Sequence, residues 1–216
     1  MEMSVIERSG CAVLAGGAGK RMGKLNKAEL NLDGQSFLTG ICSEFEKAGF
    51  RGYISVANYD QKAPEGWKLV KDSVTGPEGE FIGPTGGICS CLKQAEKDGL
   101  EGLFFAPCDA PFFSSDIIRV LADEIDRDAE CNAAMLRTPD GRLQTTFGWY
   151  SVRCIDAFQE DALSGKYKIL KTLEKLRCKF VSSRDAGIND KCFMNINNLK
   201  DYSRLSTEVK KGDRNE

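Results

Sequence analysis

A glycine-rich segment at residues 14–23 follows a short apolar run at residues 11–15 and most constrains the fold. The apolar run is typical of a buried first strand. Four glycines within eight positions allow a ligand to approach the backbone closely and turn N–H groups toward it. Lys20, Arg21 and Lys27 add positive charge in and just after this segment. Backbone donors combined with fixed cations predict a polyphosphate-binding loop after the first strand.

Two well-known phosphate loops do not match this segment. A P-loop requires Ser or Thr after Gly-Lys, whereas Arg21 follows Lys20 here. The dinucleotide fingerprint ends in Gly or Ala, whereas Met22 stands at that position. A flexible turn with solvated basic residues is the alternative interpretation, but it would not predict the further motifs described below.

Apolar runs alternate with segments of helical period along the chain, which predicts an α/β fold. We expect a Rossmann-like, mostly parallel sheet with helices on both faces, and ligands at the carboxyl ends of its strands. The expected strands are residues 11–15, 53–57, 67–70, 103–107, 131–136, 145–150 and 178–181, and the first expected helices are residues 37–48, 87–97 and 115–125.

The length predicts one domain over residues 1–205. Within it, we expect residues from about 140 to 195, with helices over 156–176, to form an insertion that covers one end of the sheet. Residues 206–216 are charged and lack apolar periodicity, which predicts a mobile tail.

Charge and composition exclude several classes of function. Thirty Lys and Arg residues balance 32 Asp and Glu, giving a net charge of −2, so we expect no nucleic-acid partner. No apolar run has membrane-spanning length, and the start lacks signal-peptide features, so we expect a cytoplasmic protein without membrane contact. The absence of histidine excludes Ser-His-Asp and Cys-His hydrolases.

The nine cysteines are odd in number and contain no Cys-x-x-Cys pair. This pattern fits neither a disulfide framework nor a common zinc site. Most of them lie in apolar runs, where cysteine acts as a small hydrophobic residue. Cys89 and Cys91 form the one close pair, and a metal or redox role for them stays open.

Asp109 follows the expected buried strand at residues 103–107 within a Pro-Cys-Asp-Ala-Pro sequence. Its carboxylate should therefore emerge at the carboxyl end of the strand, in a turn stiffened by Pro107 and Pro111. Mg²⁺ accepts few protein ligands and keeps waters and phosphate oxygens, so a single carboxylate can hold it. A turn-stabilising Asp is the alternative interpretation.

The order and spacing of four motifs resemble the molybdenum cofactor guanylyltransferases, the MobA-type family of nucleotidyltransferases. The first motif is Leu-Ala-Gly-Gly, three residues, Arg-Met-Gly and a later Lys, here residues 14–27. The others are Gly-Pro-Thr-Gly-Gly at 83–87, Pro-Cys-Asp-Ala-Pro at 107–111 and Phe-Met-Asn-Ile-Asn at 193–197. The resemblance extends from about residue 11 to 205.

This resemblance implies transfer of GMP from GTP to molybdenum-loaded molybdopterin, with Mg²⁺ as cofactor and pyrophosphate as leaving group. It also implies transient contact with molybdate-insertion proteins. Arg21, Lys27 and Asp109 would be catalytic, and Asp109 would hold the metal. The nucleotide would contact Leu14, Ala15, Gly16, Gly17, Lys27, Asp72 and Asp109, and the acceptor would contact Gly83, Gly87, Asn195 and Asn197, the two asparagines alternating on a short strand.

Three departures from the family pattern leave alternatives open. Asn26 stands where the family often has Asp, and Val56 stands where it tends to have Asn, with Asn58 two residues later. Leu143-Gln144 replaces a frequent His-Pro. A related transferase that uses CTP or another donor with a different phosphorylated acceptor is therefore one alternative. A nucleotide-binding protein without catalysis is the other.

Overall fold

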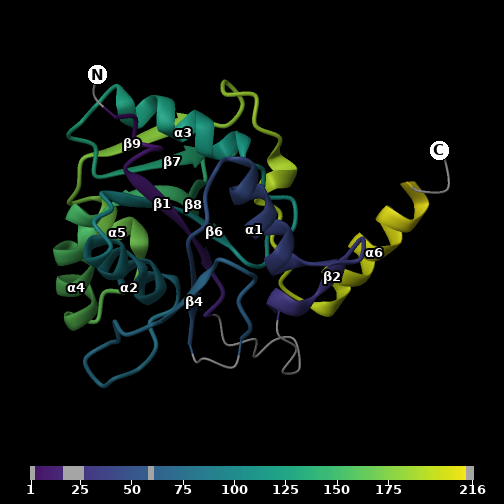
Figure 1. The fold of residues 1–216 in the computed structure, drawn as a ribbon, viewed down its shortest axis with the longest axis horizontal. Helices are drawn as coiled ribbons and strands as arrows, with labels where there is room; N and C mark the ends of the chain where they lie inside the picture. The colour runs from purple at the N-terminus through teal and green to yellow at the C-terminus, as the bar shows by residue number, and fades with distance from the viewer. Residues whose placement is uncertain (1–2, 17–26, 58–60, 213–216) are drawn as a thin grey trace.

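The computed structural model describes residues 3–16, 27–57 and 61–212, with side chains up to residue 205. A seven-stranded sheet with the order β5-β4-β1-β6-β8-β7-β9 forms its centre (Figure 1). Only β8 runs antiparallel to its two neighbours, β6 and β7. The strands are β1 (Ser9–Leu14), β4 (Tyr53–Val56), β5 (Lys68–Lys71), β6 (Gly102–Pro107), β7 (Ala133–Arg137), β8 (Leu143–Ser151) and β9 (Cys178–Ser182). The predicted mostly parallel α/β sheet is confirmed.

Helices and short elements complete the described chain. The α-helices are α1 (Phe37–Lys47), α2 (Pro84–Lys97), α3 (Asp116–Asp126), α4 (Ile155–Leu163), α5 (Ile169–Leu173) and α6 (Leu199–Gly212). Three 3₁₀ turns, η1 (Lys27–Glu29), η2 (Val152–Cys154) and η3 (Asp190–Phe193), and a small hairpin of β2 (Asn31–Leu32) and β3 (Gln35–Ser36) lie between them. No helix among the described residues is long and apolar enough to cross a membrane.

Two hydrophobic cores lie on opposite faces of the sheet because successive strand residues point to opposite sides. Along β1, Cys11 and Val13 belong to the core beneath α1 and α3. Ala12 and Leu14 belong to the core beneath α2, α4 and α5. All six residues of β1 are buried, which explains why this strand reads as a continuous apolar run rather than an alternating one.

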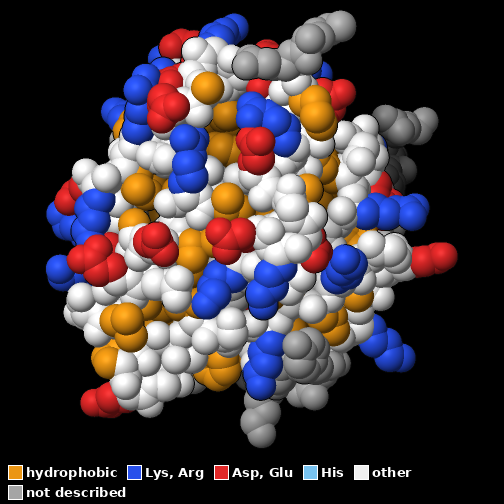
Figure 2. All heavy atoms as spheres, turned by 60° about the vertical axis from the view of Figure 1, so that its left-hand side comes forward, with side chains coloured by type: hydrophobic (Ala, Val, Ile, Leu, Met, Phe, Trp, Pro, Cys, Tyr) orange, Lys and Arg blue, Asp and Glu red, His pale blue; other side chains and the backbone are white. Residues whose placement is uncertain are grey.

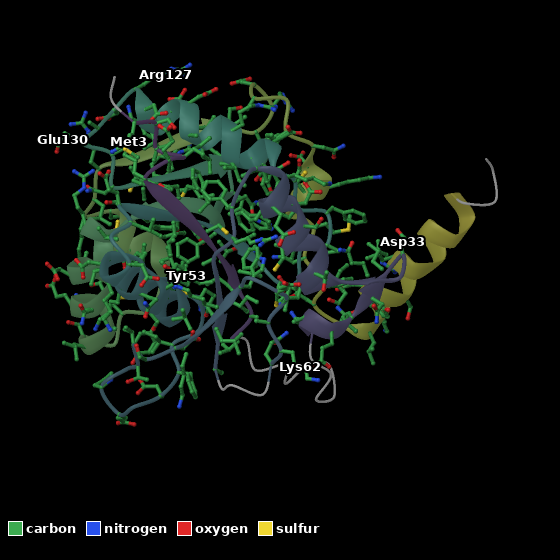
Figure 3. The ribbon with its side chains drawn as sticks, in the orientation of Figure 1. Met3, Asp33, Tyr53, Lys62, Arg127 and Glu130 are labelled. Carbon is green, nitrogen blue, oxygen red and sulfur yellow. The ribbon has the colours of Figure 1, made fainter. Side chains whose placement is uncertain are left out.

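The parallel strands β1, β4, β5 and β6 end at one side of the molecule. Leu14 lies opposite Ser55 and Pro107 in the register of the sheet, so the segments that follow β1, β4 and β6 emerge together. Figure 3 shows Lys62, which follows β4, at the lower end of the molecule, and Arg127, which follows α3, at the opposite end.

One expectation about the second half of the chain was wrong. Residues 140–195 do not form an insertion over one end of the sheet, because β8 lies between β6 and β7 and β9 forms an edge of the same sheet. At the C-terminal end, α6 extends to Gly212, past the start of the expected tail at residue 206, and the mobility of that tail stays a prediction. Figure 1 shows α6 extending away from the sheet toward the C-terminus.

Candidate active site

A pocket of about 250 Å³ lies at the carboxyl ends of β1, β4 and β6. Its lining includes nine of the residues predicted as site residues, namely Leu14, Ala15, Gly16, Lys27, Asp72, Gly83, Gly87, Asp109 and Asn195. Asn197 does not line the pocket but contacts Lys27. Gly17 and Arg21, and the variable positions Asn26 and Asn58, lie outside the described residues.

Backbone hydrogen bonds hold the strand ends at the pocket in a fixed register. The N–H of Ala15 donates to the carbonyl of Ser55 at 2.9 Å, and the N–H of Cys108 donates to the carbonyl of Leu14 at 3.0 Å. On the other side of β4, the N–H of Asp72 donates to the carbonyl of Val56 at 2.9 Å. The sheet therefore extends one residue past the strand ends and places three loop starts side by side.

Lys27 and Asp109 form an ion pair inside this pocket, although they lie 82 positions apart in the sequence. The Lys27 Nζ donates to Asp109 Oδ2 at 2.8 Å and to Asn197 Oδ1 at 3.0 Å. The Lys27 and Asp109 side chains are 21% and 18% exposed, so both remain accessible to a ligand. The pair joins the cation predicted to bind phosphate to the carboxylate predicted to bind the metal.

The segment that carries Asn195 and Asn197 is not a strand, which corrects our expectation. Its one sheet-like bond runs from the N–H of Ile196 to the carbonyl of Asp109, at 2.8 Å. Ile196 is 1% exposed and packs with Leu30, Phe37 and Leu205. Asn195 lines the pocket together with Lys27, and Asn197 accepts a hydrogen bond from Lys27, so both asparagines lie on the Lys27 side of the segment.

Asp72 is a buried carboxylate on the wall of the pocket. Its side chain accepts a hydrogen bond from the Ser55 hydroxyl at 2.6 Å. Burial raises the pKa of Asp72 from 3.8 to about 6, although the bond from Ser55 acts in the opposite direction. A buried acid with a raised pKa in a cleft is typical of a functional site.

Two glycines leave room for this carboxylate. A Cβ on Gly16 would lie 2.4 Å from Asp72 Oδ2, and a Cβ on Gly87 would lie 2.5 Å from Ser55 Oγ. Gly87 lies in the first turn of α2, which begins at Pro84 after Gly83 in a left-handed conformation with φ of 65°. Pro at the first helical position is typical of a helix start, and the N-terminus of α2 opens onto the pocket.

The motif analysis missed two polar residues of the pocket, Ser55 and Thr146. Ser55 was detectable as the single polar residue in the apolar strand Tyr53–Val56. Thr146 gave no such signal, because it reaches the pocket only through the antiparallel placement of β8 beside β6. Val56 is 2% exposed and belongs to the core beneath α1.

The donor atoms fit a magnesium ion. The Asp109 carboxylate and the asparagine amides offer oxygen, which Mg²⁺ prefers, and Mg²⁺ commonly binds one or two carboxylates together with substrate phosphates. Over the described ranges, no three His, Cys, Asp or Glu residues gather as a metal cage. The site therefore suits an ion that arrives with a phosphate ligand.

A family model described as the MobA-like NTP transferase domain matches residues 11–179. The chain belongs to this family. As a MobA-like protein it is a nucleotidyltransferase, and the predicted family is confirmed. Asp109 therefore lies within the part of the chain that matches a nucleotidyltransferase domain.

The MobA-like chain is similar to curated enzymes along nearly its whole length. It is 30% identical to the molybdenum cofactor guanylyltransferase of Cupriavidus metallidurans, over 93% of this chain and 95% of that one. It is 28% identical to a probable molybdenum cofactor guanylyltransferase of Clostridium perfringens, over 92% and 96%. In structure it resembles molybdopterin-guanine dinucleotide biosynthesis protein A of Archaeoglobus fulgidus, with a TM-score of 0.72, 21% identity and coverage of 93% and 98%.

Proposed function

We propose that this MobA-like enzyme is a molybdenum cofactor guanylyltransferase of the cytoplasm. It would transfer GMP from GTP to molybdenum-loaded molybdopterin and release pyrophosphate. Its similarity to molybdenum cofactor guanylyltransferases over nearly their whole length supports this assignment. Contact with molybdate-insertion proteins that deliver the acceptor stays a prediction of the resemblance.

The observation that carries the proposal is the meeting of Lys27 and Asp109 at 2.8 Å in the pocket. A nucleotidyl transfer needs positive charge at the triphosphate and an oxygen ligand for its metal at neighbouring points. The backbone of Leu14, Ala15 and Gly16 borders the same pocket, where it would face the nucleotide.

In the proposed reaction, an oxygen of the acceptor phosphate attacks the α-phosphorus of GTP in line. A new P–O bond forms, the bond from the α-phosphorus to the bridging oxygen breaks, and pyrophosphate leaves with the electron pair. Lys27 and Arg21 would neutralise the charge that develops on the leaving group. The attacking phosphate is already an anion, so no general base is needed, in agreement with a chain that lacks histidine.

Asp109 would hold Mg²⁺, and Asn195, which lines the same pocket, would offer a further amide oxygen. When bound, the ion supplies positive charge to phosphate oxygens and helps to orient the donor. Asp72 would bind donor groups of the nucleotide, since a carboxylate accepts but does not donate when ionised. Gly83, Gly87 and the asparagine segment would border the acceptor.

Pyrophosphate release measured with each of the four nucleoside triphosphates tests the proposal. Each assay is run with and without molybdenum-loaded molybdopterin and with and without Mg²⁺. We expect release with GTP only, dependent on both acceptor and metal. Equal turnover with CTP would favour the alternative donor, and tight GTP binding without product would favour a non-catalytic nucleotide-binding protein.

A further inference from the structure

The Lys27 ammonium bridges two side chains from distant parts of the chain. Asp109 follows β6, and Asn197 follows η3, 170 positions after Lys27. Both partners offer oxygen, so the ammonium group is held between a negative carboxylate and a neutral amide. This arrangement gives Asp109 a counter-charge before any ligand is present.

Asn197 is held in place independently of Lys27. The preceding residue, Ile196, is bonded to the backbone of Asp109 and is buried against Leu205 of α6. The N–H of Asn197 donates to Asp201 Oδ2 at 3.3 Å, in the first turn of α6. Tyr202 of the same helix donates its hydroxyl to the carbonyl of Asn31 at 2.8 Å. These contacts therefore fix the backbone at Asn197 and place its side-chain amide beside η1.

We propose that Asn197 is a positioning residue that holds Lys27 on Asp109, so that the divalent ion binds well only when nucleotide draws Lys27 away. This inference rests on the proposed function, because it takes Asp109 as the metal ligand and Lys27 as a triphosphate ligand. It assigns Asn197 to the control of metal loading rather than to acceptor binding alone.

The charges at the site explain why the binding of nucleotide and the binding of metal would be coupled. A divalent ion at Asp109 would meet the positive charge of Lys27 at short range in a partly buried pocket, where screening by solvent is reduced. A triphosphate offers Lys27 a new partner of higher charge and offers the ion further oxygen ligands. Nucleotide and metal therefore favour each other, and by linkage the effect is reciprocal.

Binding of Mn²⁺, a probe for Mg²⁺ that is detected by electron paramagnetic resonance, tests the proposal on the full chain. We compare the Mn²⁺ dissociation constant with and without GTP for the unmodified protein, Lys27→Gln and Asn197→Ala. Without GTP, we expect Lys27→Gln to bind Mn²⁺ about ten-fold more tightly, equivalent to about 1.4 kcal/mol. Asn197→Ala should also bind more tightly, by about three-fold, a difference of roughly 0.65 kcal/mol.

A gain of metal binding is a result that partial unfolding cannot produce. Lys171→Gln serves as the charge-matched control, because Lys171 of α5 pairs with Glu174, the residue that follows this helix, and it should leave Mn²⁺ binding unchanged. Unchanged Mn²⁺ binding in Lys27→Gln and Asn197→Ala would overturn the proposal. A loss in Asn197→Ala would also overturn it, because Asn197 would then be a metal ligand.

Asp109→Asn separates this inference from the proposed function. If Asp109→Asn binds Mn²⁺ in the presence of GTP as well as the unmodified protein, the assignment of the metal to Asp109 is wrong. If Asp109→Asn loses Mn²⁺ while Lys27→Gln and Asn197→Ala show no gain, the metal assignment stands and only the positioning role of Asn197 fails.

Discussion

The carboxylate of Asp72 lies directly against Gly16, so that a Cβ on Gly16 would come within 2.4 Å of Asp72 Oδ2. Real Cβ atoms do not approach an oxygen so closely, and the other oxygen of Asp72 is already bonded to Ser55. The absence of a side chain at Gly16 therefore sets the position of a buried acid that follows β5, two strands away from β1 in the sheet.

We expect Gly16→Ala to displace Asp72 and to weaken GTP binding by about ten-fold or more. Crowding a packed site of this kind destabilises a protein by roughly 1–3 kcal/mol. Isothermal titration calorimetry and thermal unfolding would measure the two effects. Gly40→Ala is the matched control, because its Cβ would have no neighbour nearer than 3.9 Å, and alanine within α1 should stabilise the helix by up to about 1 kcal/mol.

Asp109→Asn should reduce GMP transfer by about 10²-fold or more, since it removes the charge that holds the metal while preserving shape. Steady-state pyrophosphate release at saturating GTP and Mg²⁺ measures the loss. Asp123→Asn, an exposed position on α3, controls for the change in net charge and should retain activity. Retention of near-normal turnover by Asp109→Asn would contradict the assignment.

Asp72→Asn should stabilise the fold at neutral pH while weakening nucleotide binding. Burial raises the pKa of Asp72 from 3.8 to about 6, so the folded state binds more protons than the unfolded state within this interval. Stability therefore falls as the pH rises from about 4 to 6. The ionised acid costs roughly 3 kcal/mol above that window, which the neutral amide avoids.

Thermal unfolding of Asp72→Asn and the unmodified protein at a series of pH values checks this expectation. The two proteins should differ most above pH 6 and converge below about pH 4, as Asp72 becomes protonated in both states. A difference that does not vary with pH would contradict a buried ionised carboxylate.

Nucleotide affinity should fall as the pH drops below about 6, because protonated Asp72 loses its capacity as a double acceptor. Ser55→Ala should move this midpoint upward, since the Ser55 hydroxyl opposes the rise in the pKa of Asp72. Fluorescence titration with GTP between pH 5 and 8 would measure the fall in affinity and the shift of its midpoint in Ser55→Ala. Asp72→Asn supplies the baseline for protonation of the triphosphate itself.

The cysteines should react slowly with alkylating reagents in the folded protein. All nine are free and eight are buried, the exception being the half-buried Cys178. Burial raises the pKa of Cys178 to about 11 and that of Cys89 to about 12, so few thiolates are available. We expect iodoacetamide to label Cys178 first and the others only after denaturation, as peptide mass spectrometry would show.

The strands and the polar residues at their ends were predictable because β1 and β6 are buried on both faces. Such strands appear as continuous apolar runs, and the residue that follows each run is placed by the carboxyl-end rule. For this reason Asp109 and the glycine-rich segment could be assigned to one edge of the sheet from the sequence.

Contacts that depend on topology were not predictable in the same way. The reversal of β8 brings Thr146 to the pocket, and the bond from Ile196 to the Asp109 carbonyl brings Asn197 to Lys27. Neither leaves a local pattern, because both join segments far apart in the chain. The helical period of α6 was also missed, since its composition beyond residue 205 is mostly charged.

Charges of both signs are mixed on the face that Figure 2 turns toward the viewer. Lys and Arg side chains are interspersed there with Asp and Glu, in keeping with the net charge of −2. Among the described residues that line the pocket, Lys27 is the cation, and its side chain is 21% exposed.

The attachment of Asn197 to both Lys27 and the start of α6 has a consequence for biosynthesis. A ribosome makes Lys27 and Asp109 well before residues 196 and 197, so a nascent chain can form β1 and β6 while this attachment is still absent. The hydrogen bond from Lys27 to Asn197 is therefore among the last contacts of the site to form, after β9 has left the ribosomal exit tunnel. Early nascent chains would consequently meet cellular magnesium and nucleotide with a lysine that Asn197 does not yet hold.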